Sequence, residues 1–337
     1  MTRLTRRQFN IVALAGAAVA GFGLPRTASA AEETHVVLLL SGVITDGGWG
    51  QLAYQGLKSL EGKSGFKIAY AENISQAQIP QVARGYADDG ATLIIGHGYE
   101  FGSPLLEVAP DYPETKFFVS SFLPEPKVPD NIMFADLAYF DVSYAAGALA
   151  ALISEKKQSV GYVGGGDNPT QQTMLKAFVA GAGKTVPGIK GVGIVTGDYN
   201  NAAKGKQAAA TMIGNGCDVI WHAADVTGLG AIQAAVEAKV KVLGCYSDQT
   251  DLAPANMGTS FEMNLAGMVT TLADSVAGGS FKGGTEWKPT VDEMWLLKAG
   301  PEGDHNPDVV PAEAWSSFET IWKDIAARKI DVAALLK

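Results

Sequence analysis

The chain has few of the side chains that enzymes most often use to hold metals or attack substrates. Its 337 residues include two cysteines and four histidines, and the histidines lack the short spacing of a metal site. Neither a G-x-S-x-G nucleophile motif nor a G-x-G-x-x-G loop is present, and Gly183-Lys184-Thr185 lacks the upstream glycine of a phosphate-binding loop. No aspartate-rich run such as D-x-D-x-x-x-D-D occurs either. The sequence therefore predicts a protein that is not an enzyme and uses no metal or cofactor.

Basic residues are also scarce. The chain has 26 Lys and Arg against 35 Asp and Glu, a formal net charge of −9, and charged residues make up only 18% of it. The first 30 residues contain four arginines and no acid, so the rest of the chain is more acidic still. A field of this sign repels nucleic acid, and we expect no nucleic-acid partner.

The two cysteines are not expected to form a disulfide. Cys217 comes just before one apolar run and Cys245 ends the next. In neighbouring parallel strands these two ends are separated by the length of a strand, at about 3.3 Å per residue. A disulfide requires Cα atoms within about 7 Å, so two buried thiols are expected.

No apolar run is long enough to span a membrane. The longest, Ile11 to Leu24, falls short of the roughly 20 residues that a bilayer requires. It follows Arg6-Arg7 and precedes Ala28-Ser29-Ala30, the layout of a signal peptide of the twin-arginine type. We expect cleavage after Ala30, a signal peptide over residues 1–30, and a periplasmic mature protein without a lipid anchor.

Short apolar runs alternate with amphipathic stretches through the rest of the chain. Strands are predicted at residues 35–40, 66–70, 92–96, 116–120, 160–164, 191–195, 218–222, 240–244 and 293–298. Helices are predicted at residues 50–62, 78–89, 104–112, 140–156, 170–184, 202–215, 229–238, 265–277 and 312–328. This alternation indicates βαβ units and mainly parallel sheets.

A proline-rich loop near residues 123–136 interrupts the alternation, which indicates two doubly wound lobes joined by several crossings. We expect lobe one to comprise residues 31–140 and 252–288, and lobe two to comprise 141–251 and 289–337. An exported α/β protein with this organisation is typical of periplasmic binding proteins, which close around a ligand by hinge motion.

Candidate ligand-binding residues follow the strands, because open parallel sheets bind ligands outside their carboxyl ends. After the first strand come Asp46, Gly48 and Trp49, and Tyr99 follows the third. Asp46 is equally compatible with a helix cap, whereas Trp49 favours a binding role as a flat surface. His97 is better explained as a hydrogen-bonded loop histidine. In lobe two, Tyr199 and Asp225 follow two further strands.

Several strings, in order and spacing, carry a family resemblance. They are residues 46–49, 144–151, 161–165, 197–200, 218–224 and 247–249. They resemble the basic membrane protein, or PnrA-like, substrate-binding proteins of ABC importers, whose characterised members bind purine nucleosides or bases. The resemblance implies a type I periplasmic binding fold, a small-molecule ligand, a permease partner and a monomer. It also implies that Trp49 and Tyr199 sandwich the purine, while Asp46 and the Phe140-Asp141 segment contact the edge of the base.

Two positions depart from the nucleoside-binding members. Tyr246 stands where those proteins have the ribose-binding Asp, in the segment that also holds Asp248, and Met263 stands where they have a sugar-binding Lys. These departures favour a free base or another planar heterocycle, with Tyr246 and Asp248 in the binding site. A sugar or nucleoside receptor on the same fold and an exported nucleoside-processing enzyme are the alternatives.

We predict that the protein is exported through the twin-arginine route and cleaved after Ala30. Mass spectrometry of periplasmic protein is expected to find Ala31 at the N-terminus, and an intact Met1 would contradict this. The double change Arg6→Lys with Arg7→Lys is expected to abolish export; unchanged export would exclude the twin-arginine route.

Overall fold

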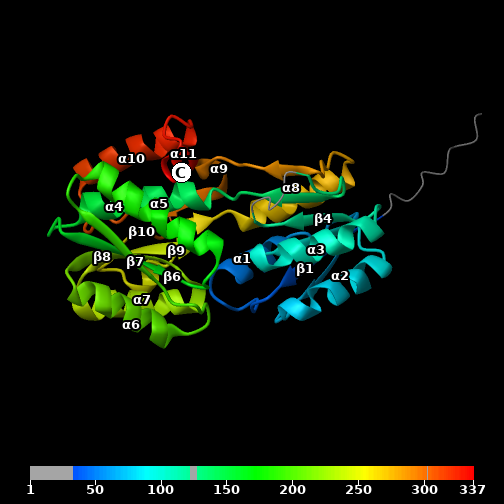
Figure 1. The fold of residues 1–337 in the computed structure, drawn as a ribbon, viewed down its shortest axis with the longest axis horizontal. Coiled ribbons are helices and arrows are strands. Elements are labelled where there is room, and N and C mark those ends of the chain that lie inside the picture. Colours follow the sequence, from blue (N-terminus) through cyan, green and yellow to red (C-terminus); the bar gives the residue numbers. More distant parts are fainter. Residues whose placement is uncertain (1–32, 122–126, 302) are drawn as a thin grey trace, which may run out of the picture. The chain divides into compact units, whose positions relative to one another are not determined.

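Two six-stranded sheets form the framework of the molecule (Figure 1). The computed structural model describes residues 33–121, 127–301 and 303–337. The expected signal peptide therefore lies outside the described residues. No helix within these ranges is long and apolar enough to cross a membrane.

The first sheet has the strand order β11-β5-β4-β3-β1-β2, and all its pairs are parallel. Its strands are β1 (Thr34–Leu40), β2 (Phe66–Ala71), β3 (Leu93–His97), β4 (Lys116–Val119), β5 (Ile132–Ala135) and β11 (Thr285–Trp287). Its helices are α1 (Trp49–Lys58), α2 (Ile79–Asp88), α3 (Gly102–Val108) and α8 (Leu265–Ala277).

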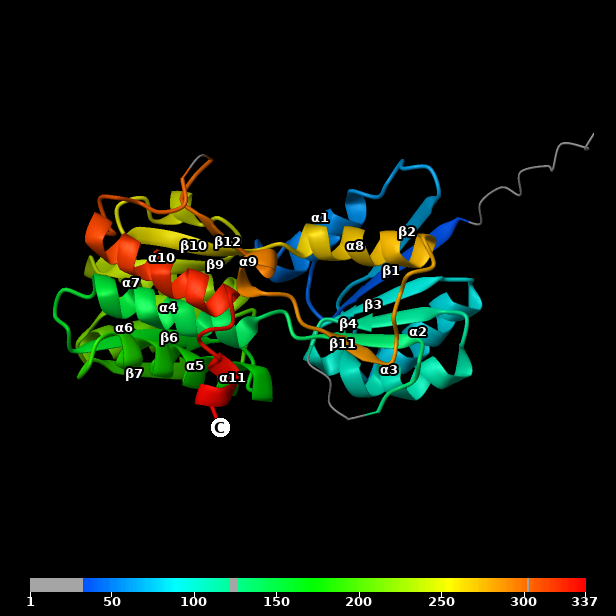
Figure 2. The ribbon, with the colours of Figure 1, turned by 90° about the horizontal axis from the view of Figure 1, so that it is seen from above.

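Alternate residues of β1 serve opposite faces of this sheet, as a strand buried on both sides requires. Val36 and Leu38 pack in the core that contains α1 and α8, whereas Val37 and Leu39 pack in the core that contains α2 and α3. Figure 2 shows α8 lying beside α1. The two helices touch closely, because a Cβ at Gly56 would lie 2.8 Å from the Cα of Ala266.

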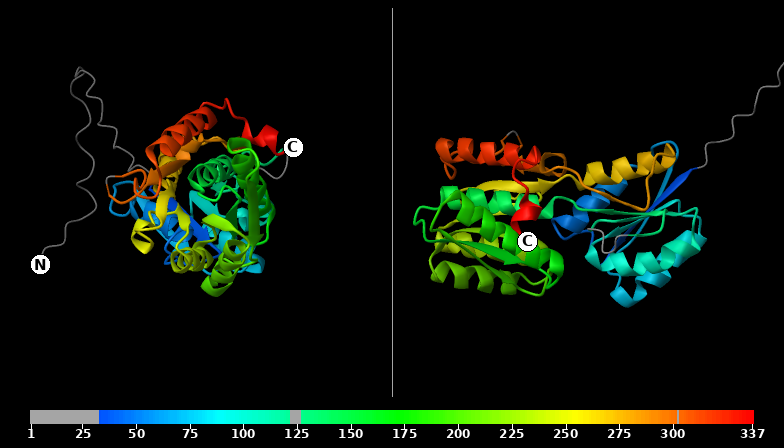
Figure 3. Two further views of the ribbon diagram at one scale, coloured as in Figure 1. Left: turned by 90° about the vertical axis from the view of Figure 1, so that its left-hand side faces the viewer. Right: turned by 45° about the horizontal axis from the view of Figure 1, so that its top comes forward.

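The second sheet has the order β12-β10-β9-β8-β6-β7, in which only β12 is antiparallel to its neighbour. Its strands are β6 (Ser159–Gly164), β7 (Lys190–Val195), β8 (Cys217–Ala223), β9 (Lys241–Tyr246), β10 (Met257–Met263) and β12 (Trp295–Lys298). Its helices are α4 (Tyr139–Ile153), α5 (Pro169–Thr185), α6 (Ala202–Gly214), α7 (Asp225–Ala238), α9 (Val291–Met294), α10 (Ala312–Ala326) and α11 (Val332–Leu335). Helix α10 packs on α4 (Figure 3).

The expected α/β class and the two doubly wound lobes are confirmed. Cys217 and Cys245 are buried free thiols, as expected. One lobe boundary differs: the sequence predicts that residues 257–263 belong to lobe one, but they form β10, which pairs with β9 in the second sheet. The chain returns to lobe one only after Met263. The apolar and small residues of β10 have no clear alternation, so its identity as a buried strand was not apparent from the sequence.

Helices α4 and α5 approach each other through a pair of glycines. A Cβ at Gly147 would lie 2.1 Å from the carbonyl oxygen of Phe178, and a Cβ at Gly181 would lie 2.0 Å from that of Tyr144. Neither carbonyl is able to move without displacing its helix, so any larger residue forces the two helices apart.

We predict that Gly181→Ala lowers the free energy of unfolding by about 1–3 kcal/mol because it overpacks this contact. Gly183→Ala in the same helix is the matched control, since a Cβ there meets nothing within 4 Å. The control is expected to be neutral or to stabilise by up to about 1 kcal/mol through helix propensity. Urea denaturation of both variants measures the difference; equal stability would contradict the close approach.

Candidate ligand-binding cavity

A cavity lies where the carboxyl ends of strands from both sheets meet. Lobe one contributes the loops after β1, β3 and β4, and lobe two contributes the loops after β6, β7, β8 and β9. Tyr139, at the start of α4, lines the cavity from the first connection between the lobes. This is the edge at which open parallel sheets bind ligands.

Aromatic rings form much of the cavity wall. They are Trp49, Tyr99, Tyr139, Tyr199 and Tyr246. The Trp49 ring lies 3.8 Å from that of His97 between centroids, at an interplanar angle of 31°, and 6.5 Å from that of Tyr246. Both members of the expected sandwich, Trp49 and Tyr199, therefore line one cavity, from opposite lobes.

His97 supports Trp49 and is not free to act as a base. Its Nδ1 lies 2.9 Å from the Ser120 hydroxyl and its Nε2 lies 3.3 Å from the Trp49 carbonyl oxygen. Complete burial lowers the pKa of His97 to about 3, so the imidazole is neutral. This agrees with the expected role as a hydrogen-bonded loop histidine.

Asp46 caps helix α1. One carboxylate oxygen accepts hydrogen bonds from the backbone N–H groups of Gly48 (2.9 Å) and Gln51 (3.0 Å), and the other accepts from that of Gly50 (2.7 Å). The negative charge also complements the helix dipole. Asp46 lines the cavity, but its oxygens are used to fix the turn that presents Trp49.

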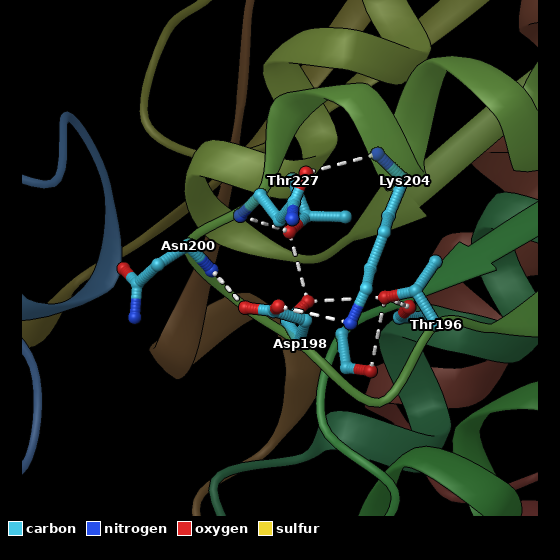
Figure 4. Close-up of polar contacts among 8 residues, drawn as sticks. Thr196, Asp198, Asn200, Lys204 and Thr227 are labelled. Atoms are coloured by element: carbon cyan, nitrogen blue, oxygen red, sulfur yellow. Dashed lines mark hydrogen bonds and ion pairs between the residues drawn. The ribbon is translucent and has the colours of Figure 1, made fainter.

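The loop that carries Tyr199 is held by a polar network (Figure 4). The Thr196 and Thr227 hydroxyls both donate to the Asp198 carbonyl oxygen, at 3.0 and 2.8 Å. The Asp198 carboxylate accepts from the Asn200 backbone N–H at 2.9 Å and pairs with Lys204 at 3.0 Å. Those two contacts lower the pKa of Asp198, the backbone hydrogen bond more strongly.

Tyr199 itself lies against two glycines. A Cβ at Gly165 would lie 2.1 Å from its ring, and a Cβ at Gly166 would lie 2.5 Å from it. Its hydroxyl accepts a hydrogen bond from the Asn168 amide at 3.1 Å. Burial, more than the nearby Asp225 carboxylate, raises the pKa of Tyr199 to about 12. The ring is therefore neutral and held in one position.

Asp225 is the most perturbed acid in the cavity. Burial, with a smaller contribution from Asp46, raises its pKa to about 8, although a hydrogen bond from the backbone N–H of Trp49 lowers it in part. Its backbone has a φ of +47°, an unusual conformation for a residue other than glycine. A strained and desolvated residue at such a position points to a function that offsets the strain.

The lobes approach each other beside this carboxylate. A Cβ at Gly48 would lie 3.5 Å from Oδ1 of Asp225 and 3.7 Å from Cβ of Tyr246. The Ser247 hydroxyl, in lobe two, donates to the Gly47 carbonyl oxygen, in lobe one, at 2.9 Å. Gly48 is thus buried at the contact between the lobes, outside the residues that line the cavity.

Four buried polar atoms of the cavity have no hydrogen-bond partner. They are Trp49 Nε1, Tyr139 Oη, Thr170 Oγ1 and Asp225 Oδ1. Burial raises the pKa of the Tyr139 hydroxyl well above its usual value of 10, and the nearby Trp49 indole lowers it in part. The two groups nevertheless lack the geometry of a hydrogen bond. Each such atom costs about 1–3 kcal/mol while it stays unpaired. The four together present a donor, an acceptor and two hydroxyls to a ligand.

The charged side chains that line the cavity are all acidic: Asp46, Glu100 and Asp225. The Ser41 hydroxyl donates to the Glu100 carboxylate. No Lys or Arg is among the lining residues in the described ranges, nor do three His, Cys, Asp or Glu residues gather there as a metal site would need. The cavity therefore suits a neutral or cationic planar molecule better than a phosphate or carboxylate.

Phe140 and Asp141 lie outside this cavity, which corrects the sequence-based expectation. They line a second pocket with Asp136, Lys288 and Arg328. Successive residues of a helix are turned by about 100°, so Tyr139 faces the ligand cavity while its two successors face elsewhere. Burial, and then Asp136, raises the pKa of Asp141 to about 6.

Asp248 and Met263 also lie outside the cavity lining. The Asp248 carboxylate accepts hydrogen bonds from the backbone N–H groups of Thr250 (3.1 Å) and Gly300 (3.0 Å), so it fastens a loop. Met263 is buried in the core of lobe two, paired with Trp295 of β12. The argument against ribose therefore depends on Tyr246 alone.

Several lining residues were not predicted. Tyr139, Glu100, Thr170, Gln171 and Met174 line the cavity without having been identified from the sequence. Glu100 directly follows Tyr99, and Thr170 is the second residue of α5, after a glycine-rich turn, so their positions after strand ends were the available signal.

A family model of PnrA-like ABC transporter substrate-binding proteins matches residues 33–334. The chain belongs to this family. Basic membrane protein A2 of Borrelia garinii is 25% identical over 302 residues, covering 88% of this chain and 87% of that protein. A purine-binding protein of Brucella abortus is 28% identical over 287 residues, covering 84% and 78%.

The fold is shared with solved solute-binding proteins. The crystal structure of an ABC transporter solute-binding protein from Aeropyrum pernix superposes with a TM-score of 0.71 at 21% identity, covering 88% of this chain and 92% of that one. The type I periplasmic binding fold expected from the resemblance is confirmed. As a member of this family of ABC transporter substrate-binding proteins, it binds a small-molecule ligand and a membrane permease.

We predict that Asp225→Asn stabilises the ligand-free protein increasingly as the pH rises from 4 to 8. In this interval the folded protein holds a proton on Asp225, with a pKa of about 8, that the unfolded chain releases near 3.8. Wild-type stability from this group is therefore full below pH 4 and is lost as the pH rises. Asparagine mimics the protonated acid and tolerates a positive φ.

Thermal unfolding at several pH values measures this effect as a growing difference in Tm. Asp308→Asn removes one exposed carboxylate outside the cavity and shows how much of the difference comes from net charge alone. A Tm difference for Asp225→Asn that is constant with pH would contradict the buried, protonated state.

Proposed function

We propose that the cavity binds a purine base, or a closely similar planar heterocycle, for uptake by an ABC importer. The observation that carries this is the set of four unpaired polar atoms within an aromatic wall whose described residues include no Lys or Arg. A purine base is flat, uncharged and has ring N–H donors and ring nitrogen acceptors around its edge, which match that set. The purine-binding relative from Brucella supports the same ligand class.

The aromatic rings supply the stacking surfaces. Trp49 and Tyr199 are held by separate structures, Trp49 by the Asp46 cap and His97, and Tyr199 by two glycines and the network of Figure 4. Rings that are already ordered lose little conformational entropy when a base inserts between them. Stacking of one base on an aromatic side chain contributes about 1–3 kcal/mol.

The edge of the base would pair with the unpaired atoms. The Trp49 indole N–H is an obligate donor, suited to a ring nitrogen or a carbonyl oxygen. Asp225 Oδ1 is suited to a ring or exocyclic N–H group. The Tyr139 and Thr170 hydroxyls adapt to either partner, so oxopurines and aminopurines both satisfy the site.

Tyr246 favours the base over its nucleoside. Its side chain lines the cavity where nucleoside-binding relatives are expected to hold ribose, and its backbone φ of +72° is a strained conformation for tyrosine. A phenol ring in that place fills the volume of a sugar and offers one hydroxyl in place of a carboxylate. Ribose hydroxyls left unpaired would each cost about 1–3 kcal/mol.

We predict that ligand-stripped protein binds adenine, hypoxanthine, guanine or xanthine at least about ten-fold more tightly than the corresponding nucleoside. Isothermal titration calorimetry of each base beside its nucleoside, with ribose as a third arm, measures the ratio. Equal affinity for base and nucleoside would refute the role of Tyr246, and tight binding of ribose alone would favour the sugar alternative. Chromatography of nucleosides left with the protein is expected to show no released base.

We also predict that Trp49→Ala weakens binding of the preferred base by about ten-fold or more, because one stacking face is lost. Tyr70→Ala is the control, since Tyr70 is a half-exposed ring on β2 outside the cavity. The control is expected to leave the affinity within two-fold of the wild type. An unchanged affinity in Trp49→Ala would place the base elsewhere.

A further inference from the structure

In the part of the chain that the structure describes, three segments connect the two lobes. The first lies between β5 and α4 (residues 136–138), the second between β10 and α8 (residue 264), and the third between β11 and α9 (residues 288–290). Figure 2 shows the third running past the first, and the backbone N–H of Asp136 donates to the Trp287 carbonyl oxygen at 3.0 Å. Any hinge motion changes backbone angles within these segments.

Trp295 hydrogen-bonds to the first connection and lies close in the structure or the sequence to residues that flank the other two. Its indole N–H donates to the Leu137 carbonyl oxygen of the first at 2.8 Å. Its backbone pairs with Met263, the residue before the second, and the Asn264 N–H donates to the carbonyl oxygen of Met294 at 2.9 Å. Trp295 itself follows the third connection through α9, and its side chain is almost completely buried.

The Trp295 ring also lies directly behind the ligand cavity. Its centroid is 6.1 Å from that of Tyr139, in an edge-on arrangement, and 6.0 Å from that of Tyr246. Both tyrosines line the cavity. A movement of either ring on ligand binding is therefore transmitted to Trp295 and to the first connection bonded to it, because close-packed interiors have little free space to absorb it.

The first connection shows where bending would be absorbed. Ala138 follows Leu137 and has a φ of +55°, a left-handed conformation that costs an alanine free energy. It sits between the carbonyl that receives the Trp295 hydrogen bond and Tyr139, the first residue of α4. Loss of the hydrogen bond would free this strained segment to relax.

We propose that Trp295 is a positioning residue that links the occupancy of the cavity to the angle between the lobes. Its indole hydrogen bond ties the first connection to β12, which follows the third connection through α9, so that the two connections bend together. Its ring contacts those of Tyr139 and Tyr246 and moves with them. This inference goes beyond the purine proposal, because it holds for any ligand that contacts those two tyrosines.

Trp295→Phe tests this role, because phenylalanine keeps an aromatic ring but lacks the N–H donor. Trp322→Phe in α10 is the matched control: Trp322 packs on Phe261 and Phe318 in the same lobe, away from the connections. Dyes on Lys63→Cys and Lys184→Cys, both exposed and in different lobes, report the distance between lobes by single-molecule FRET. The native cysteines, Cys217 and Cys245, are buried and therefore do not compete for the dyes.

We expect Trp295→Phe, but not Trp322→Phe, to broaden or shift the FRET distribution of the ligand-free protein. We also expect Trp295→Phe to weaken binding of the preferred base by about three- to ten-fold. An unchanged distribution, or the same change in both variants, would overturn the proposal. If no base binds the wild type, the purine proposal fails while the ligand-free distributions still decide the role of Trp295.

Incorporation of β-(3-benzothienyl)alanine at position 295 covers the case in which Trp295→Phe does not fold. This residue has the size of tryptophan but carries sulfur in place of the N–H group. It is expected to reproduce the shifted distribution with a Tm close to that of the wild type. A wild-type distribution in this variant would also overturn the proposal.

Discussion

The buried acid Asp225, which holds a proton because no Lys or Arg among the described lining residues balances its charge, is the constraint on which the binding site depends. Taking a carboxylate out of water is costly unless it gains hydrogen bonds or a proton. The fold supplies only part of what this group needs, through the backbone N–H of Trp49, and leaves Oδ1 unpaired. Aromatic rings line the cavity around this group and exclude water from it. Other polar atoms of the cavity also lack hydrogen-bond partners.

The position of Asp225 also links ligand binding to the contact between the two lobes. Asp225 comes from lobe two, whereas the amide that faces it and the glycine beside it come from lobe one. The loop after β1 packs beside the carboxyl group at Gly48, next to the point where the Ser247 hydroxyl donates to the Gly47 carbonyl oxygen.

Much of the fold was predictable because most long strands are largely apolar runs followed by a helix with its own apolar face; the seven-residue strand β10 is the exception, because its residues do not alternate. The short strands β5 and β11 were missed, because three or four residues are too few to show the alternation typical of a strand. The site was predictable to the level of loops but not of side chains. Tyr139 and Phe140 are adjacent in sequence, and only the starting angle of α4 decides which of them faces the ligand. Likewise, the sequence places Asp46 and Asp225 after strands, but only the structure shows that Asp46 is paired locally with the start of α1, whereas one oxygen of Asp225 has no partner.

Neither lobe is a continuous piece of chain. The first sheet is completed by β11 and covered by α8, which follow the whole βαβ series of the second lobe, and the second sheet is completed by β12 near the C-terminus. Such pairings between distant segments form slowly, because the intervening chain must be ordered first. As the protein is synthesised, the first lobe emerges with an uncovered edge strand and must await some 150 further residues. Folding is therefore a late event that requires almost the entire polypeptide, and neither lobe is separable as a contiguous fragment.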